Sequence, residues 1–177
     1  MSLAAHPDRP FDFDDLLNLS EDGLRYEVID GALVVNAAPT WRHQEIAARL
    51  WRLLQDCAPP GVKVLPAVAW RIGPGQAPEP DLIAVERSGL AERAVEAIPM
   101  LVVEVLSPSN RGMDLVRKRA LYAEGGCPCY WLVDPDGPTV TTLLLEGGGY
   151  SETGRFAGSH PVVVECPWPL RFVPADL

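Results

Sequence analysis

The sequence predicts an α/β protein, with a mixed sheet flanked by helices, and three features indicate this class. Residues 99–106 (PMLVVEVL) are an almost uninterrupted apolar run, as expected of a central strand covered on both faces. A helix over roughly 113–124 and a strand over 129–134 follow with short links, which predicts a parallel pair of strands with a right-handed crossover. Asp30-Gly31, between the apolar-rich arms of residues 25–36, predicts an N-terminal β-hairpin.

The other elements follow from turn residues and apolar spacing. Thr40 is expected to cap a helix that runs to about Asp56, because Ile46, Leu50, Leu53 and Leu54 recur at helical spacing. Residues 1–10 are expected to be frayed. We further predict a short helix at 11–19, strands at 62–72, 80–85 and 139–145, a short helix or loop at 88–97, a loop at 147–149, and one or two strands within 160–172 that close the sheet.

Length and composition indicate a single globular domain over residues 1–177. No run reaches the roughly 18 apolar residues of a membrane span, and Met1–Arg9 lacks the pattern of a secretory signal, so we expect a cytoplasmic protein without a membrane partner. The four cysteines, Cys57, Cys127, Cys129 and Cys166, lack the repeated spacing of a zinc site. We expect reduced thiols in or near the core.

The formal net charge of −9 counts against a protein that coats DNA through charge alone. It leaves open an enzyme whose metal ions supply positive charge locally. The chain has only two lysines, Lys63 and Lys118, which makes the position of each informative.

Two acidic residues are candidates for chemistry. Glu104 lies inside the predicted central strand, where an ionised carboxylate is costly unless it is paired, hydrogen-bonded or bound to a metal. Asp81 opens the strand at 80–85, two residues after Glu79. Acids at corresponding heights on neighbouring strands would line a cleft with oxygen atoms, which suits Mg²⁺ or Mn²⁺. The alternatives are a buried salt bridge from Glu104 to an arginine, and an Asp81 in water at the start of a strand.

Lys118 is the third candidate. Asp114, Lys118 and Tyr122 fall at i, i+4 and i+8 of the helix after the Glu104 strand, so their stripe can face the acids. The alternative is a surface pair between Asp114 and Lys118 that contributes a few tenths of a kcal/mol.

Further candidates lie on three elements. Glu27 shares a face of the hairpin with Ile29 and can point inward, although an exposed strand acid is the alternative. His43 leans towards the buried side of its helix, where a packed, hydrogen-bonded histidine is the alternative to a ligand or base. Near Lys118 a basic cluster could contact phosphates or form a solvated helix face: Arg111, Arg117 and Arg119.

Several segments together resemble the Uma-type family of putative restriction endonucleases, long catalogued as a domain of unknown function and abundant in cyanobacteria. The segments are RYEVIDGALVV (25–35), RHQEIAARL (42–50), PDLIAV (80–85), LVVEVLSPSNRGMDLVRKRALYAEGGCPCYWLVDP (101–135) and the last predicted hairpin. Their order and spacing agree with the family over nearly the whole chain.

The resemblance implies a restriction-endonuclease-like PD-(D/E)XK core. Asp81 would be the PD aspartate and Glu104 the acid of the second element, while Leu106 stands at the usual lysine position, so that Lys118 would be the replacement. Glu27 matches an acid that the family places in the first hairpin. One departure is Cys129, where the family commonly has Glu before Tyr-Trp.

The resemblance further implies an endonuclease acting on DNA, with Mg²⁺ or Mn²⁺ held by Asp81 and Glu104 and with Glu27 as a possible further metal ligand. Lys118 would position the attacking water or stabilise charge on the phosphate. His43, Asp114 and Tyr122 would support the site. A homodimer is expected, because cleavage of a duplex needs two cuts. Two alternatives remain: a catalytically silent scaffold that binds nucleic acid or protein, and a glycosidase-like hydrolase with a carboxylate pair.

Overall fold

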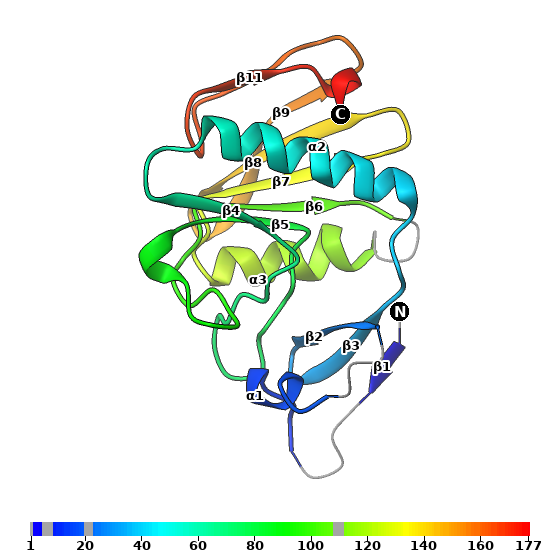
Figure 1. Ribbon diagram of the computed structural model, residues 1–177, viewed down its shortest axis with the longest axis vertical. Coiled ribbons are helices and arrows are strands. Elements are labelled where there is room, and N and C mark those ends of the chain that lie inside the picture. The colour runs from blue at the N-terminus through cyan, green and yellow to red at the C-terminus, as the bar shows by residue number, and fades with distance from the viewer. Residues whose placement is uncertain (1, 5–8, 20–22, 108–111) are drawn as a thin grey trace.

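The computed structural model describes residues 2–4, 9–19, 23–107 and 112–177, with the backbone alone for 2–4 and 113–115. Its centre is a six-stranded mixed sheet in the order β4-β5-β6-β7-β8-β9 (Figure 1). The strands are β4 (Val62–Pro66), β5 (Leu82–Glu86), β6 (Leu101–Val105), β7 (Cys129–Asp134), β8 (Thr139–Glu146) and β9 (Gly149–Ala157). Only β6 and β7 pair in parallel; the other neighbours are antiparallel. The predicted mixed sheet and its parallel pair are confirmed.

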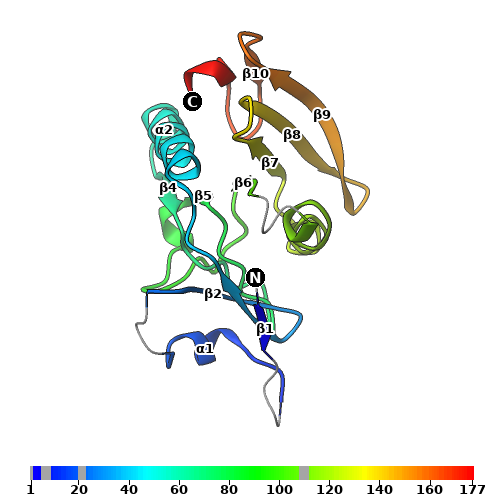
Figure 2. The same ribbon diagram turned by 90° about the vertical axis from the view of Figure 1, so that its right-hand side faces the viewer.

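Helices cover both faces of this sheet (Figure 2). On one face α2 (Trp41–Cys57) buries Ile46, Leu50 and Leu54 against alternate residues of β6. On the other face lie a π-helical segment, η2 (Met113–Lys118), and α3 (Arg119–Glu124). Because strand side chains alternate between faces, Glu104 shares its face with Val102, which packs in the cluster that contains Tyr122 of α3. The tertiary packing therefore directs Glu104 towards the helix that carries Lys118.

The predicted N-terminal hairpin is confirmed as β2 (Arg25–Ile29) and β3 (Ala32–Asn36). Its turn residues Asp30 and Gly31 have φ of 54° and 70°, the left-handed conformation that a two-residue turn of this kind requires. A short α1 (Phe13–Leu16) packs beneath the hairpin. The prediction of frayed residues 1–10 is wrong for β1 (Ser2–Ala4), which pairs with the open edge of β3.

Two predictions about the C-terminal part were wrong. Strand β9, which pairs with β8 through a turn at residues 147–148, was missed because it is an edge strand with few buried side chains. The strands β10 (Val162–Val164) and β11 (Leu170–Phe172) do not close the main sheet; they form a two-stranded sheet of their own, followed by a short 3₁₀ turn, η3 (Pro174–Asp176).

Two other boundaries differ from expectation, whereas the short helix or loop predicted at 88–97 is confirmed. The strand predicted over 62–72 ends at Pro66, and Ala67 with φ of 50° turns the chain away from the sheet. The predicted helix over 113–124 divides into η2 and α3. Between β5 and β6 the structure has only a 3₁₀ turn, η1 (Arg87–Gly89), and loop.

The cysteine prediction was wrong for one pair. Cys129 of β7 and Cys166 form a disulfide, with Cα atoms 6.3 Å apart, across 37 positions of sequence. Cys57 and Cys127 are free, as predicted, the first exposed and the second buried. No helix in the described part of the chain is both long and apolar enough to cross a membrane.

Candidate active site

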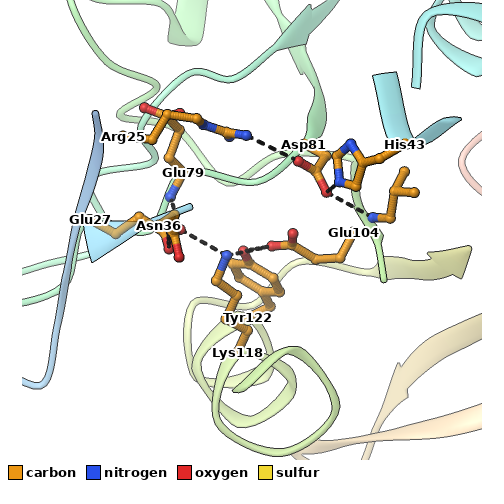
Figure 3. A network of polar contacts seen from close by, with 10 residues as sticks. Arg25, Glu27, Asn36, His43, Glu79, Asp81, Glu104, Lys118 and Tyr122 are labelled. Carbon is orange, nitrogen blue, oxygen red and sulfur yellow. Dashed lines mark hydrogen bonds and ion pairs between the residues drawn. The ribbon is translucent and has the colours of Figure 1, made fainter. Parts of the chain in front are cut away.

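A cavity of about 170 Å³ opens between the N-terminal hairpin, the start of α2 and the central strands. The polar side chains at this site come from β2, β3, α2, the approach to β5, β6 and the helical segment after it (Figure 3). The cavity is lined by Arg25, Asn36, Ala37, Ala38, Pro39, Thr40, His43, Glu79, Asp81, Glu104, Ser107 and Lys118. Three predicted core residues, Asp81, Glu104 and Lys118, are therefore brought to one cavity.

Glu104 is 1% exposed on β6. Its Oε1 accepts hydrogen bonds from Lys118 Nζ at 3.0 Å and from the Tyr122 hydroxyl at 2.5 Å. Burial, and then the negative charge of Glu104, raise the pKa of Tyr122 well above its ordinary value, so this hydroxyl remains a donor. Among the described residues the cation paired with Glu104 is a lysine, Lys118, rather than an arginine.

Lys118 is 4% exposed and links two elements. Its Nζ lies 2.8 Å from Glu27 Oε1 on the hairpin and 3.0 Å from Glu104 Oε1 on the sheet. Because this lysine is buried, the alternative of a surface pair with Asp114 is wrong. The side chain of Asp114 itself lies outside the described residues.

Glu27 is fully buried, so the alternative of an exposed strand acid is wrong as well. Besides Lys118, its Oε1 accepts the backbone N–H of Glu79 at 2.6 Å, and its Oε2 accepts Asn36 Nδ2 at 2.7 Å. Glu27 does not line the cavity. It stands behind Lys118 and fixes the position of that ammonium group.

Asp81 lies directly before β5 and is buried, which rules out the alternative of an acid in water. Its Oδ2 accepts the Val105 backbone N–H at 2.8 Å and lies 3.1 Å from His43 Nε2, while Oδ1 lies 3.5 Å from Arg25. Burial alone would raise the pKa of Asp81, but the hydrogen bond and charge of His43, the Val105 N–H and the charge of Lys118 together hold it below the usual value. Asp81 is therefore an anion at neutral pH.

His43 is the packed, hydrogen-bonded residue that its position on α2 suggested. An ionised carboxylate only accepts hydrogen bonds, so Nε2 carries the proton that faces Asp81. Within the described structure the buried Nδ1 has no hydrogen-bond partner. The Thr40 cap, which accepts the His43 backbone N–H at 3.3 Å, holds this first turn of α2 in place.

Sequence reasoning missed Arg25 and Asn36, and it noted Glu79 only as a neighbour of Asp81. Arg25 Nε lies 2.7 Å from Glu79 Oε1, and burial raises the pKa of Glu79 despite this arginine. A signal was present, because Arg25 and Glu27 are two residues apart on one strand and therefore share a face.

The two described members of the basic cluster do not line the cavity. Arg117 pairs instead with Asp30 of the hairpin turn and lies 3.7 Å from Glu124. Arg119 donates to the backbone carbonyl of Tyr150. Arg111 lies outside the described residues.

Charge at the site favours an additional cation. Among the described residues, four carboxylates face two cationic side chains, so these six charges sum to two negative charges. The six residues are Glu27, Glu79, Asp81, Glu104, Arg25 and Lys118. In the part of the chain that the structure describes, no three His, Cys, Asp or Glu side chains already converge as a metal cluster. Magnesium nevertheless commonly binds through one or two carboxylates and keeps several waters, so the oxygen donors Asp81 and Glu104 fit such an ion in kind and charge.

Comparison with known proteins bears on the fold and the family. A crystal structure described as "a putative nuclease belonging to DUF820 from Anabaena variabilis" superposes with a TM-score of 0.70 at 21% identity, covering 88% of this chain and 89% of that one. At this identity the likeness concerns the fold, which is restriction-endonuclease-like. No curated protein matches. The family model Uma2, described as "Putative restriction endonuclease", matches residues 12–170. The predicted resemblance is confirmed: this chain belongs to the Uma2 family.

Proposed function

We propose that this protein is a metal-dependent endonuclease that hydrolyses phosphodiester bonds of DNA at the cavity of Asp81, Glu104 and Lys118. The observation that carries the proposal is the buried ion triad Glu27–Lys118–Glu104, of which Lys118 and Glu104 line an open cavity together with Asp81. Burying such charges is expensive, and hydrophobic side chains of similar volume often give a more stable core. A cluster of buried charges at a cavity is therefore a candidate functional site.

Asp81 and Glu104 are the residues that would hold Mg²⁺ or Mn²⁺. The chemistry that such an ion supplies when bound is neutralisation of the phosphate charge and a lower pKa for the attacking water. His43 and the Val105 N–H keep the Asp81 carboxylate ionised and fixed in orientation, so that its remaining oxygen, Oδ1, faces Arg25. The metal role predicted for Glu27 stays a prediction. As placed, its oxygens accept two hydrogen bonds and form an ion pair with Lys118, and we assign it to positioning Lys118.

Lys118 is the residue that would act on the phosphate or on the water. Its ammonium group lines the cavity and is held from two sides by carboxylates, which restricts its motion before substrate arrives. A preorganised cation of this kind stabilises the negative charge that develops on phosphate oxygens in the transition state. Tyr122 shares Glu104 Oε1 with Lys118 and fixes the carboxylate that orients the lysine.

The test combines metal binding and cleavage on the same samples. Calorimetry with Mg²⁺ and Mn²⁺, together with a plasmid-nicking assay, is run on wild type, Asp81→Asn and Glu104→Gln. Asp56→Asn on the exposed side of α2 serves as the matched surface control. We expect binding and nicking to be lost in both site variants and kept in the control, with circular dichroism unchanged. If wild type binds neither ion, the nuclease proposal fails and a catalytically silent scaffold is the better description.

The expected homodimer also stays a prediction. Two cavities on one particle would allow both strands of a duplex to be cut. Sedimentation of the protein with and without DNA measures the assembly state directly.

A further inference from the structure

Trp41 differs from the other tryptophans of the chain in its exposure. It is 71% exposed, whereas Trp70, Trp131 and Trp168 are buried. Trp51, on the same helix, is 39% exposed, and its indole N–H donates to the Val64 carbonyl at 2.8 Å. A large aromatic side chain left in solvent is more informative than a scattered surface aliphatic, because it places extensive apolar surface where something can cover it.

Trp41 stands at the edge of the candidate active site. It is the first residue of α2. Pro39 and Thr40 directly before it, and His43 two residues after it, line the cavity. Figure 1 shows α2 starting on the side of the molecule where β6 ends. Consecutive Cα atoms are about 3.8 Å apart, so the backbone of Trp41 directly adjoins the cavity wall at Thr40.

Positive charge accompanies the exposed ring. The Arg42 guanidinium lies 5.5 Å from the centroid of the Trp41 ring, and its nearest carboxylate, on Asp136, is 3.9 Å away with both side chains more than half exposed. An exposed pair at this separation holds a cation weakly. The first backbone N–H groups of this 17-residue helix also lack intrahelical partners and carry its positive dipole end. The helix start thus offers an aromatic face, a mobile guanidinium and donors for a phosphate.

We propose that Trp41 is a stacking platform for an unpaired nucleobase, with Arg42 and the α2 N-terminus binding the adjoining phosphate, so that the substrate is single-stranded or frayed DNA. The inference rests on the proposed function and specifies its substrate class. Bases inside a duplex are already stacked on one another and cannot lie on an external ring, whereas every unpaired base has a free face for an indole. Stacking also explains how a chain of net charge −9 can hold DNA, since it supplies affinity that charge does not.

Binding is measured by fluorescence anisotropy of a labelled 12-nucleotide single strand and of a hairpin duplex of the same sequence, with Ca²⁺ in place of Mg²⁺. Trp41→Ala should weaken binding of the single strand roughly 5- to 100-fold, while Trp41→Phe keeps most of the affinity. Trp51→Phe is the matched control on the same helix and should change nothing. A strand with abasic positions removes the stacking base from the ligand, just as Trp41→Ala removes the ring from the protein. Wild type should bind the abasic strand more weakly than the intact strand, by about the factor that Trp41→Ala costs on the intact strand. Trp41→Ala should bind the two strands with nearly equal affinity.

Four outcomes overturn the inference: unchanged binding in Trp41→Ala, equal losses on strand and hairpin, additive losses from the variant and the abasic strand, or absence of binding. A dimer that forms in wild type and dissociates in Trp41→Ala also overturns it, because the ring is then covered by a second copy.

Plasmid nicking separates the two proposals. Nicking by a Trp41→Ala protein with unchanged strand binding refutes stacking and keeps the nuclease. Trp41-dependent binding without any nicking supports stacking and refutes the nuclease.

Discussion

Lys118→Met removes the cation from the buried triad and leaves the two carboxylates of Glu27 and Glu104 without it. Both carboxylates are buried, 0% and 1% exposed, so water solvates them poorly once the cation is gone. Removing one member of a buried ion pair typically costs about 3–5 kcal/mol, because the remaining charge stays desolvated and uncompensated. Both ion contacts, at 2.8 and 3.0 Å, are lost at once, so we expect a value in the upper part of that range.

The assay is urea unfolding followed by tryptophan fluorescence. With an m-value of about 2 kcal/mol per molar urea, a loss of about 4 kcal/mol lowers the midpoint by roughly 2 M. Lys63 is the only other lysine and lies exposed on β4, so Lys63→Met is a matched control and should stay within about 0.5 kcal/mol of wild type.

Two further results follow from the same reasoning. Lys118→Met with Glu27→Gln and Glu104→Gln should be more stable than Lys118→Met alone, since no unpaired charge remains. Mg²⁺ should raise the stability of Lys118→Met more than that of wild type, because the site then has one more uncompensated negative charge. A loss below about 1 kcal/mol in Lys118→Met, with no rescue by the triple variant, would refute the buried triad.

Two other predictions concern the thiols and the hairpin turn. Burial raises the pKa of the Cys127 thiol to about 12, so an alkylating reagent at pH 8 should modify the exposed Cys57 and spare Cys127. Mass spectrometry of the native protein counts the modified sites. Rapid modification of both cysteines would contradict this prediction. The hydrogen bond from Arg117 holds the pKa of Asp30 below its ordinary 3.8, so this contact stabilises the fold above pH 4 and its contribution disappears as pH falls through the lowered pKa. Arg117→Gln should therefore be slightly less stable than wild type at pH 7 and equal to it near pH 2; a difference that persists at pH 2 would assign the effect to packing instead.

The sequence by itself determined the elements whose signals are local. Asp30-Gly31 specified the hairpin because its two turn residues must adopt positive φ, and the strand–helix–strand run at 101–134 specified the parallel pair. Glu104 and Lys118 were also recognisable as candidate site residues. A carboxylate in a continuous apolar run is costly to bury, and Lys118 is one of only two lysines in the chain.

Only the tertiary structure decided which partners these groups meet. Asn36 and Glu79 carry no unusual local pattern, and Arg25 only shares a strand face with Glu27. The contacts of Arg25 and Glu27 with Glu79 arise because the hairpin packs beside the approach to β5, more than 40 positions away in sequence. The Cys129–Cys166 disulfide, the pairing of β1 with β3 and the separate β10–β11 sheet depend in the same way on contacts between distant segments. Local sequence sets backbone preferences and faces, whereas charge pairing and burial are set by segments that only the folded chain brings together.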